Sequence, residues 1–202
     1  SAETKDLNIS LQEPASSMWI ADMKSHEMHM ANKKVLLTGF EPFGNATFNP
    51  SEAVVKEISK LSPAGIDLVT EILPVEFKRS ATLLLEKIRD VQPDIVISLG
   101  QAEGRDYIGP EQVAINLADA RIADNAGIAL ENTPIDEKAP DGFFTTLPIR
   151  EIVKAIQELH ISAKVSYSAG AFICNEIFFA AQRELVGSKV ISGFIHLPLA
   201  PV

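Results

Sequence analysis

Short apolar runs alternate with segments of helical periodicity along most of this chain. Near-continuous apolar runs of four to eight residues are typical of strands that are buried on both faces of a sheet. The first run, residues 35–40, also ends in a glycine turn, which favours a strand over a helix. The strand-like runs, in chain order, are 35–40, 68–73, 94–100, 112–117, 164–168 and 190–196.

Between these runs, apolar residues recur at the 3.6-residue spacing of an amphipathic helix. In the first such segment Val54, Val55, Ile58 and Leu61 fall on one face, and Ser51 is the expected cap of the helix start. The helices that this spacing predicts, in chain order, cover residues 51–61, 77–91, 149–159 and 174–185.

Apolar strands alternating with helices predict an α/β fold. We expect a single-domain α/β/α sandwich with a mainly parallel, twisted sheet that is covered by helices on both faces. Residues 118–142 interrupt the alternation with a polar stretch rich in Asp, Asn, Gly and Pro. Excursions of this length often contribute to function.

The first 30 residues differ in composition from the rest of the chain. All four methionines and the single tryptophan, Trp19, lie there, without sustained periodicity. We therefore expect residues 1–30 to be an N-terminal extension, tag or leader, and residues 31–202 to form the domain. An arm that docks on the domain or on a neighbouring molecule is the alternative.

Composition narrows the classes of function. The 202 residues are 46% hydrophobic and 22% charged, which suits one globular domain with a sizeable core. The net charge of −9 argues against binding to nucleic acid, and no apolar run approaches the roughly 20 residues of a membrane span. A single cysteine fits a reducing, cytoplasmic setting. No metal-ligand spacing occurs, so we expect no metal site.

That cysteine, Cys174, follows a strand-like run and a turn of small residues, near the start of a predicted helix. In open parallel sheets, functional sites form beyond the carboxyl ends of the strands. Free N–H groups and the positive end of a helix dipole stabilise a thiolate, so this position should lower the pKa of the thiol. An inert buried cysteine is the alternative.

His196 ends the last predicted strand and can face the same crevice. A Cys–His pair, with a third group that orients the imidazole, is the minimal arrangement for thiol catalysis. Glu111, at a loop-to-strand junction, is a candidate for that third group. Spacing alone does not separate it from four nearby acids, Glu103, Asp106, Asp119 and Asp124.

The glycine turn at residues 38–44 reads Thr-Gly-Phe-Glu-Pro-Phe-Gly. It matches neither the P-loop nor the dinucleotide fingerprint, and Glu41 would repel a phosphate. Phe40 and Phe43 instead offer two aromatic faces beside a tight turn. Packing of both rings in the core is the alternative.

Several of these segments together resemble the pyroglutamyl peptidase I (pyrrolidone-carboxylate peptidase) family of cysteine peptidases. The turn at 38–44 resembles a motif in the N-terminal half of the family, and residues 100–116 resemble its glutamate signature. Residues 168–175 resemble its cysteine signature, and residues 193–198 resemble its histidine region. The similarity runs in the expected order from about residue 34 to residue 198, so the match is specific.

The resemblance implies an omega-peptidase, a cysteine-type exopeptidase that removes the N-terminal pyroglutamyl (5-oxoprolyl) residue from peptides without a cofactor. It implies a triad of Glu111, His196 and Cys174, with Arg121 at the oxyanion site. The substrate-binding residues that it implies are Phe40, Phe43, Gln101, Ile122, Phe172 and Ile173. It also implies a pyroglutamyl-peptidase-like catalytic domain over residues 31–202 and a cytoplasmic homo-oligomer, either a dimer or a tetramer.

The chain departs from the family pattern in three places. Gln112 stands where the family usually has Arg or Lys, and residues 1–30 have no counterpart. The family continues past its histidine region into a final helix, whereas this chain ends six residues after His196, so we expect that helix to be missing.

Three other functions stay open at this point. A nucleoside-phosphorylase-like transferase would share the fold class but needs a phosphate site, which the sequence does not offer. A catalytically impaired pyroglutamyl-binding homologue would keep the pocket alone. A redox sensor would use only the thiol of Cys174.

Overall fold

The computed structural model describes residues 32–199, and the predictions for residues 1–30 and for the final helix lie outside this range. Its elements largely follow the predicted alternation of strands and helices. In chain order they are β1 (Lys33–Phe40), α2 (Pro50–Ile58), β2 (Ile66–Leu73), α3 (Arg79–Val91), β3 (Ile95–Ala102), β4 (Gly109–Pro110), β5 (Val113–Ile115), β6 (Gly142–Phe144), α4 (Ile149–Glu158), α5 (Ile173–Glu184) and β7 (Ile191–Pro198).

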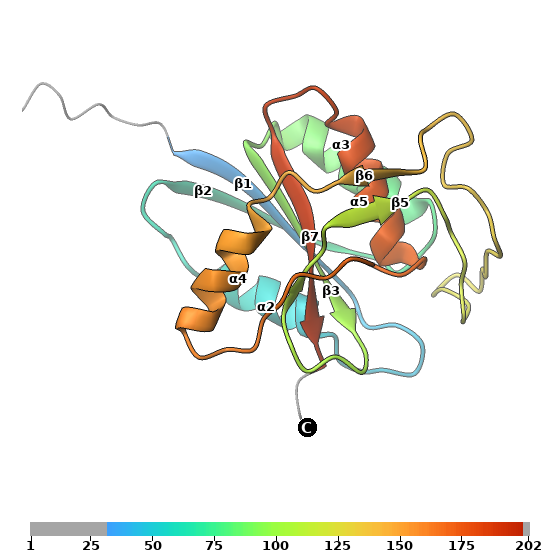
Figure 1. Cartoon of the computed structure of the whole chain (residues 1–202), viewed down its shortest axis with the longest axis horizontal. Coiled ribbons are helices and arrows are strands. Elements are labelled where there is room, and N and C mark those ends of the chain that lie inside the picture. Colours follow the sequence, from blue (N-terminus) through green and yellow to red (C-terminus); the bar gives the residue numbers. More distant parts are fainter. Residues whose placement is uncertain (1–31, 200–202) are drawn as a thin grey trace, which may run out of the picture. The chain divides into compact units, whose positions relative to one another are not determined.

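The main sheet of the described residues has five strands in the order β2-β1-β3-β7-β4 (Figure 1). The first four strands are parallel, and only the two-residue β4 runs antiparallel, against β7. Because the four parallel strands share one direction, their carboxyl ends lie along one edge of the sheet. The prediction of a mainly parallel sheet is therefore confirmed.

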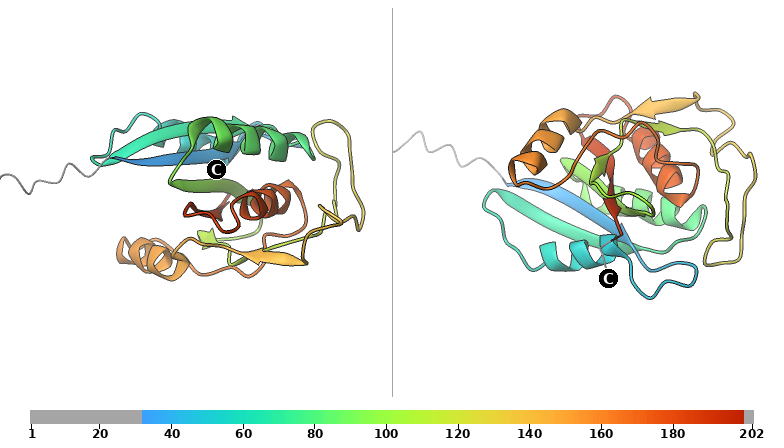
Figure 2. Two further views of the ribbon diagram at one scale, coloured as in Figure 1. Left: turned by 90° about the horizontal axis from the view of Figure 1, so that it is seen from above. Right: turned by 60° about the horizontal axis from the view of Figure 1, so that its bottom comes forward.

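Two neighbouring residues of β1 mark the two faces of the sheet. Leu36 belongs to a core cluster with apolar residues of α3 and α5, including Leu84 and Ile177. Leu37 points the other way, into a second cluster with residues of α2 and α4. Figures 1 and 2 show these helix pairs on opposite sides of the strands. The layered α/β/α arrangement is confirmed.

The start of α2 differs from the prediction, because Asn49 rather than Ser51 caps the helix. The Asn49 side chain accepts a hydrogen bond from the N–H of Ser51 at 2.9 Å, and Pro50 occupies the first turn. The Ser51 hydroxyl instead accepts a hydrogen bond from the N–H of Phe40 at 2.9 Å. It thereby ties the end of β1 to the beginning of α2.

Helix α3 begins at Arg79, later than predicted, because two partly or fully buried carboxylates hold the preceding N–H groups. Asp124 accepts from the N–H of Phe77 at 2.8 Å, and both oxygens of Glu176 accept from the N–H of Lys78 at 3.0 Å. Burial raises the pKa of Glu176 to about 7, against the opposing effect of Lys78. These carboxylates connect the entry of α3 to α5 and to the 118–142 excursion.

The strand-like run at 164–168 does not form a full strand. It lies parallel to the segment before β5 and makes only isolated bridges, such as the one between Glu111 and Ser166. Lys164 and Ser166 donate their N–H groups to the carbonyls of Ile108 and Pro110. Pro110 has no N–H to return, so the ladder is interrupted there.

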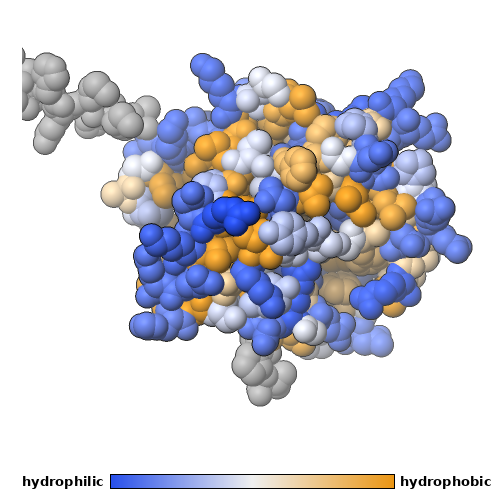
Figure 3. All heavy atoms as spheres, in the orientation of Figure 1, coloured by the Kyte–Doolittle hydropathy of each residue, from blue (hydrophilic) through white to orange (hydrophobic). Residues whose placement is uncertain are grey.

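The run at 112–117 shortens to β5, which pairs with β6 in a separate two-stranded sheet. On the face shown in Figure 3, hydrophilic side chains form most of the outline, with apolar patches between them. Within residues 32–199, no helix combines the length and the apolar character that crossing a membrane requires.

Candidate active site

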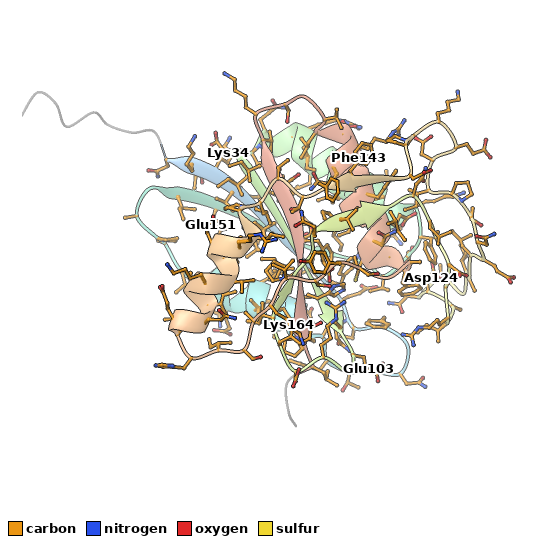
Figure 4. All side chains as sticks on the ribbon, viewed as in Figure 1. Lys34, Glu103, Asp124, Phe143, Glu151 and Lys164 are labelled. Carbon is orange, nitrogen blue, oxygen red and sulfur yellow. The ribbon has the colours of Figure 1, made fainter. Side chains whose placement is uncertain are left out.

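One cavity of about 490 Å³ opens at the carboxyl edge of the parallel strands. Glu103, which follows β3, lies at this edge (Figure 4). Glu111 lies behind the cavity wall and is fully buried. The other residues predicted for the site all line the cavity: Phe40, Phe43, Gln101, Arg121, Ile122, Phe172, Ile173, Cys174 and His196.

Glu111 and His196 form a buried pair. The antiparallel pairing of β4 with β7 sets Glu111 beside the strand of the histidine, and its N–H donates to the carbonyl of Phe194 at 2.9 Å. Nδ1 of His196 lies 2.7 Å from a carboxylate oxygen of Glu111. Because an ionised carboxylate can only accept, Nδ1 carries the proton, which leaves Nε2 as the ring nitrogen not engaged by Glu111. The ring of Phe194 packs against the imidazole at a centroid distance of 4.8 Å.

Cys174 is the second residue of α5, whose N-terminus borders the cavity. A Cβ atom on Gly100 would lie 2.9 Å from Sγ of Cys174, so the sulfur rests directly over this glycine of β3. Gly100 is also the register partner of His196 on β7. The sulfur, on α5, and the histidine, on β7, therefore lie at the same cavity on either side of Gly100.

The next residue, Asn175, fixes this end of α5. Its buried side chain accepts from the N–H of Ile115 at 3.0 Å and donates to the carbonyls of Ile115 and Leu117 at 2.8 and 2.9 Å. An amide can satisfy a strand backbone in this way because it offers both an acceptor and two donors. The side chain therefore attaches the helix start to β5.

The prediction that the pKa of Cys174 is lowered is wrong. Although part of the residue is exposed, desolvation of the thiol, reinforced by the negative charge of Glu111, raises its pKa to about 12. Burial also lowers the pKa of His196, more than Glu111 raises it. Both shifts favour a neutral thiol beside a neutral imidazole.

Glu111 stays ionised in spite of its burial. Desolvation alone would raise its pKa, but the hydrogen bonds from His196 and Arg105 hold it below the usual range. Arg105 was not among the predicted site residues. Its Nη1 donates to Glu111 at 2.8 Å, and its Nη2 donates to the carbonyl of Ser168 at 2.9 Å.

Aromatic rings form one wall of the cavity. Phe43 and Phe172 lie 6.3 Å apart between ring centroids, and Phe77 supports Phe172 edge-on at 5.3 Å. Phe40 is buried at the end of β1. Ile173 borders the cavity but packs in the main core beneath it.

Polar groups complete the lining. Gln101 has a buried side-chain oxygen without a hydrogen-bond partner. Such an atom is costly in an apolar setting unless a ligand supplies a donor. Arg121 and Ile122 are exposed at the rim, on the excursion.

The four competing acids separate clearly in space from Glu111. Asp124 caps the entry of α3, and Asp106 is exposed. Glu103 and Asp119 line the cavity, whereas Glu111 alone among the five hydrogen-bonds the imidazole. In residues 32–199, no three His, Cys, Asp or Glu side chains gather as a metal site would require.

Comparisons with known proteins agree with this geometry. The family described as "Pyroglutamyl peptidase" matches residues 33–202. A pyrrolidone-carboxylate peptidase from Vibrio vulnificus is 43% identical over 169 residues, which cover 84% of this chain and 80% of that protein. The crystal structure of Bacillus amyloliquefaciens pyroglutamyl peptidase I superposes with a TM-score of 0.81 at 44% identity, covering 84% of each chain.

A mutant pyrrolidone carboxyl peptidase from Pyrococcus furiosus, at 39% identity, superposes with a TM-score of 0.80 over 83% of this chain and 82% of its own. Sequence and fold thus agree over nearly all of the residues that the structure describes. This chain belongs to the pyroglutamyl peptidase family of cysteine peptidases.

Proposed function

We propose that the cavity removes N-terminal pyroglutamyl residues from peptides, with Cys174 as nucleophile, His196 as acid–base and Glu111 as its orienting group. The observation that best supports this proposal is the arrangement of the three groups. The 2.7 Å Glu111–His196 contact stands beside a sulfur held over Gly100, all at one aromatic-lined cavity. Thiol acyl transfer needs a nucleophile, a base and a group that orients the base.

The lactam ring is the part of the substrate that the cavity would recognise. It is uncharged and has no free α-amino group, so an apolar pocket with few polar partners suffices. Phe40, Phe43 and Phe172 would contact its faces, with Ile122 and Ile173 at the borders. Gln101 would contact the ring through its main chain, and its unpartnered side-chain oxygen is a further acceptor for the lactam N–H.

The first step forms a thioester. Nε2 of His196 takes the proton of the Cys174 thiol as sulfur attacks the pyroglutamyl carbonyl, because the resting pair is neutral. Arg121 and the unpaired N–H groups at the start of α5 would stabilise the oxyanion. The imidazolium then returns its proton to the departing amine, and the peptide leaves without its first residue.

The second step regenerates the enzyme. Water attacks the thioester carbonyl while Nε2 of His196 accepts its proton, and the proton then returns to the sulfur as free pyroglutamate departs. Glu111 keeps the same ring tautomer through both steps and stabilises the imidazolium.

We further propose that the partners are peptides with an N-terminal pyroglutamate. The family relationship and the single thiol also support a cytoplasmic homo-oligomer, dimer or tetramer. Within residues 32–199, no specific contact favours a phosphorylase or a redox sensor, and the family match argues against both.

The decisive experiment is hydrolysis of a chromogenic pyroglutamyl amide by the purified chain and by Cys174→Ser. The wild type should release the chromophore, and the variant should not. Binding of the amide without turnover by a folded wild type would instead indicate the impaired homologue. Full activity in Cys174→Ser would refute the nucleophile.

A further inference from the structure

The residues before Glu111 pass from a bend at Tyr107 into the short strand β4. Side chains at every second position of a strand share a face. Arg105, Tyr107, Gly109 and Glu111 follow this spacing. The structure shows them in mutual contact, which makes Arg105 part of a built arrangement instead of an incidental neighbour.

Each member of this arrangement holds the guanidinium of Arg105. The guanidinium lies 5.7 Å from the ring centroid of Tyr107, and Lys164 covers the same ring at 3.9 Å. A Cβ on Gly109 would lie 3.0 Å from Nη1 of Arg105. The glycine therefore leaves space for the forked guanidinium group, called the fork below. The fork thus has a fixed orientation before it meets its partners.

The two arms of the fork reach different parts of the site. Nη1 donates to the same Glu111 oxygen that accepts from His196, and Nη2 donates to the carbonyl of Ser168. Ser168 lies in the turn that leads to Cys174. The other Glu111 oxygen is buried without a hydrogen-bond partner. Loss of Arg105 would therefore leave a buried carboxylate with little to fix its rotation.

We infer that Arg105 is a positioning residue, which locks the Glu111 carboxylate against His196 and ties this pair to the turn before Cys174. The inference rests on the proposed function of the triad. A displaced carboxylate would free the imidazole to rotate or change tautomer, so the chemical step should slow by roughly 10- to 100-fold. Substrate affinity should change far less, because the aromatic wall is untouched.

The positive charge of Arg105 also changes the pKa values of the neighbouring site residues in a predictable direction. It lowers the pKa of both His196 and Cys174, while Glu111 raises both. The other charged groups that line the cavity, Glu103, Asp119 and Arg121, would stay in place. Removing the charge should therefore shift both limbs of the pH profile to higher pH and slow alkylation of the thiol at a fixed pH.

The test compares Arg105→Gln, Arg105→Lys and a control, Arg79→Gln. Arg79 also forms an Arg–Glu pair, with Glu76 at 3.0 Å, but on the surface. For each folded variant, kcat and KM on a pyroglutamyl amide, the pH profile, and the iodoacetamide rate at pH 8 are measured. Circular dichroism and thermal melting report the fold.

Arg105→Gln should lose kcat with little change in KM, shift its profile upward and alkylate more slowly. Arg105→Lys keeps the charge but not the fork, so it should restore the pH profile and alkylation while kcat stays low. Arg79→Gln should match the wild type. The inference is overturned if Arg105→Gln changes only KM, or lowers the melting temperature without changing kcat, profile or alkylation.

The inference can still be tested if Arg105→Gln does not fold or if the wild type does not cleave the amide. If Arg105→Gln fails to fold, Arg105→Lys still tests the fork, because wild-type kcat in that variant would refute it. If the wild type fails to cleave the amide, the proposed function fails. The alkylation rates then still decide whether Arg105 acts on the thiol site.

Discussion

Gly100 and His196 are register partners on the adjacent parallel strands β3 and β7, and the sulfur of Cys174 rests over the glycine. Because Gly100 has no side chain, the sulfur of Cys174 can lie against β3, and this contact determines its position relative to His196. Even a methyl group here would meet the sulfur at 2.9 Å and the ring of Phe194 at 2.6 Å.

We therefore expect Gly100→Ala to lower kcat/KM by roughly 100-fold, because displacement of about 1 Å suffices for such a loss. Gly142→Ala is the matched control, since its Cβ would also be crowded, 2.7 Å from the carbonyl of Ala114, but on β6. Kinetics and melting curves of both separate local displacement from general strain. Equal losses of activity in the two variants would contradict the assignment.

The neutral resting pair predicts the pH dependence of alkylation. With the pKa of Cys174 raised to about 12, the rate with iodoacetamide should climb about tenfold per pH unit through the neutral and mildly alkaline range. Mass spectrometry should find one label per chain, as expected for the single cysteine. A plateau near neutral pH would instead indicate a preformed thiolate–imidazolium pair.

Glu111→Gln should separate orientation from thiol reactivity. An amide can donate to Nδ1 and favour the wrong tautomer, so kcat should fall by roughly 10²- to 10⁴-fold with a smaller effect on KM. Alkylation should become faster, because the charge of Glu111 raises the pKa of Cys174. Asp106→Asn, at an exposed competing acid, serves as the control in the same assays. Wild-type turnover in Glu111→Gln would show that another group holds the imidazole.

Glu176 predicts a pH-dependent stability. Its pKa is raised from 4.5 to about 7 in the folded chain, so the folded state holds this proton more tightly than the unfolded state. Stability from this group should therefore fall as pH rises from about 4.5 to about 7. Glu176→Gln should flatten this decline in urea midpoints, whereas Glu57→Gln, at an exposed glutamate, should not. Parallel curves for all three proteins would refute the linkage.

Selectivity should follow from the uncharged lactam. Glutaminyl and glutamyl amides would bring an ammonium into an aromatic pocket, and a prolyl amide lacks the lactam oxygen. Catalytic efficiency should therefore favour the pyroglutamyl amide by orders of magnitude. Phe43→Ala should raise KM for that amide more than it alters the alkylation of Cys174. Similar rates on all four amides would mean that the ring pocket lies elsewhere.

Periodicity predicted the layers of this fold because the spacing of apolar residues, which can be read from each short segment alone, reflects which side chains are buried. Periodicity was wrong about the start of a helix or the extent of a strand where a contact with a distant residue determines it. The cap of α2 is Asn49 because Ser51 is taken by the N–H of Phe40, and Pro110 interrupts the ladder of the 164–168 run.

For the site, the motifs indicated which residues meet in the cavity, but not their electrostatics. The effect of the helix start on Cys174 was foreseen, whereas desolvation and the facing Glu111 depend on the folded arrangement. Arg105 carried one usable signal, its two-residue spacing from Tyr107, Gly109 and Glu111. That spacing becomes informative only when the folded structure shows that Tyr107 and Glu111 both contact the guanidinium of Arg105.

The side chain of Asn175 gives the nucleophile a distant reporter. It accepts from the N–H of Ile115, so that amide hydrogen exchanges with solvent only when the first turn of α5 separates from β5. Cys174 is the residue before Asn175. The exchange rate of the Ile115 amide on β5 therefore reports how often the first turn of α5, with Cys174 on it, moves away from the sheet. Slower deuterium uptake at Ile115 on formation of the thioester would measure how far acylation immobilises the helix.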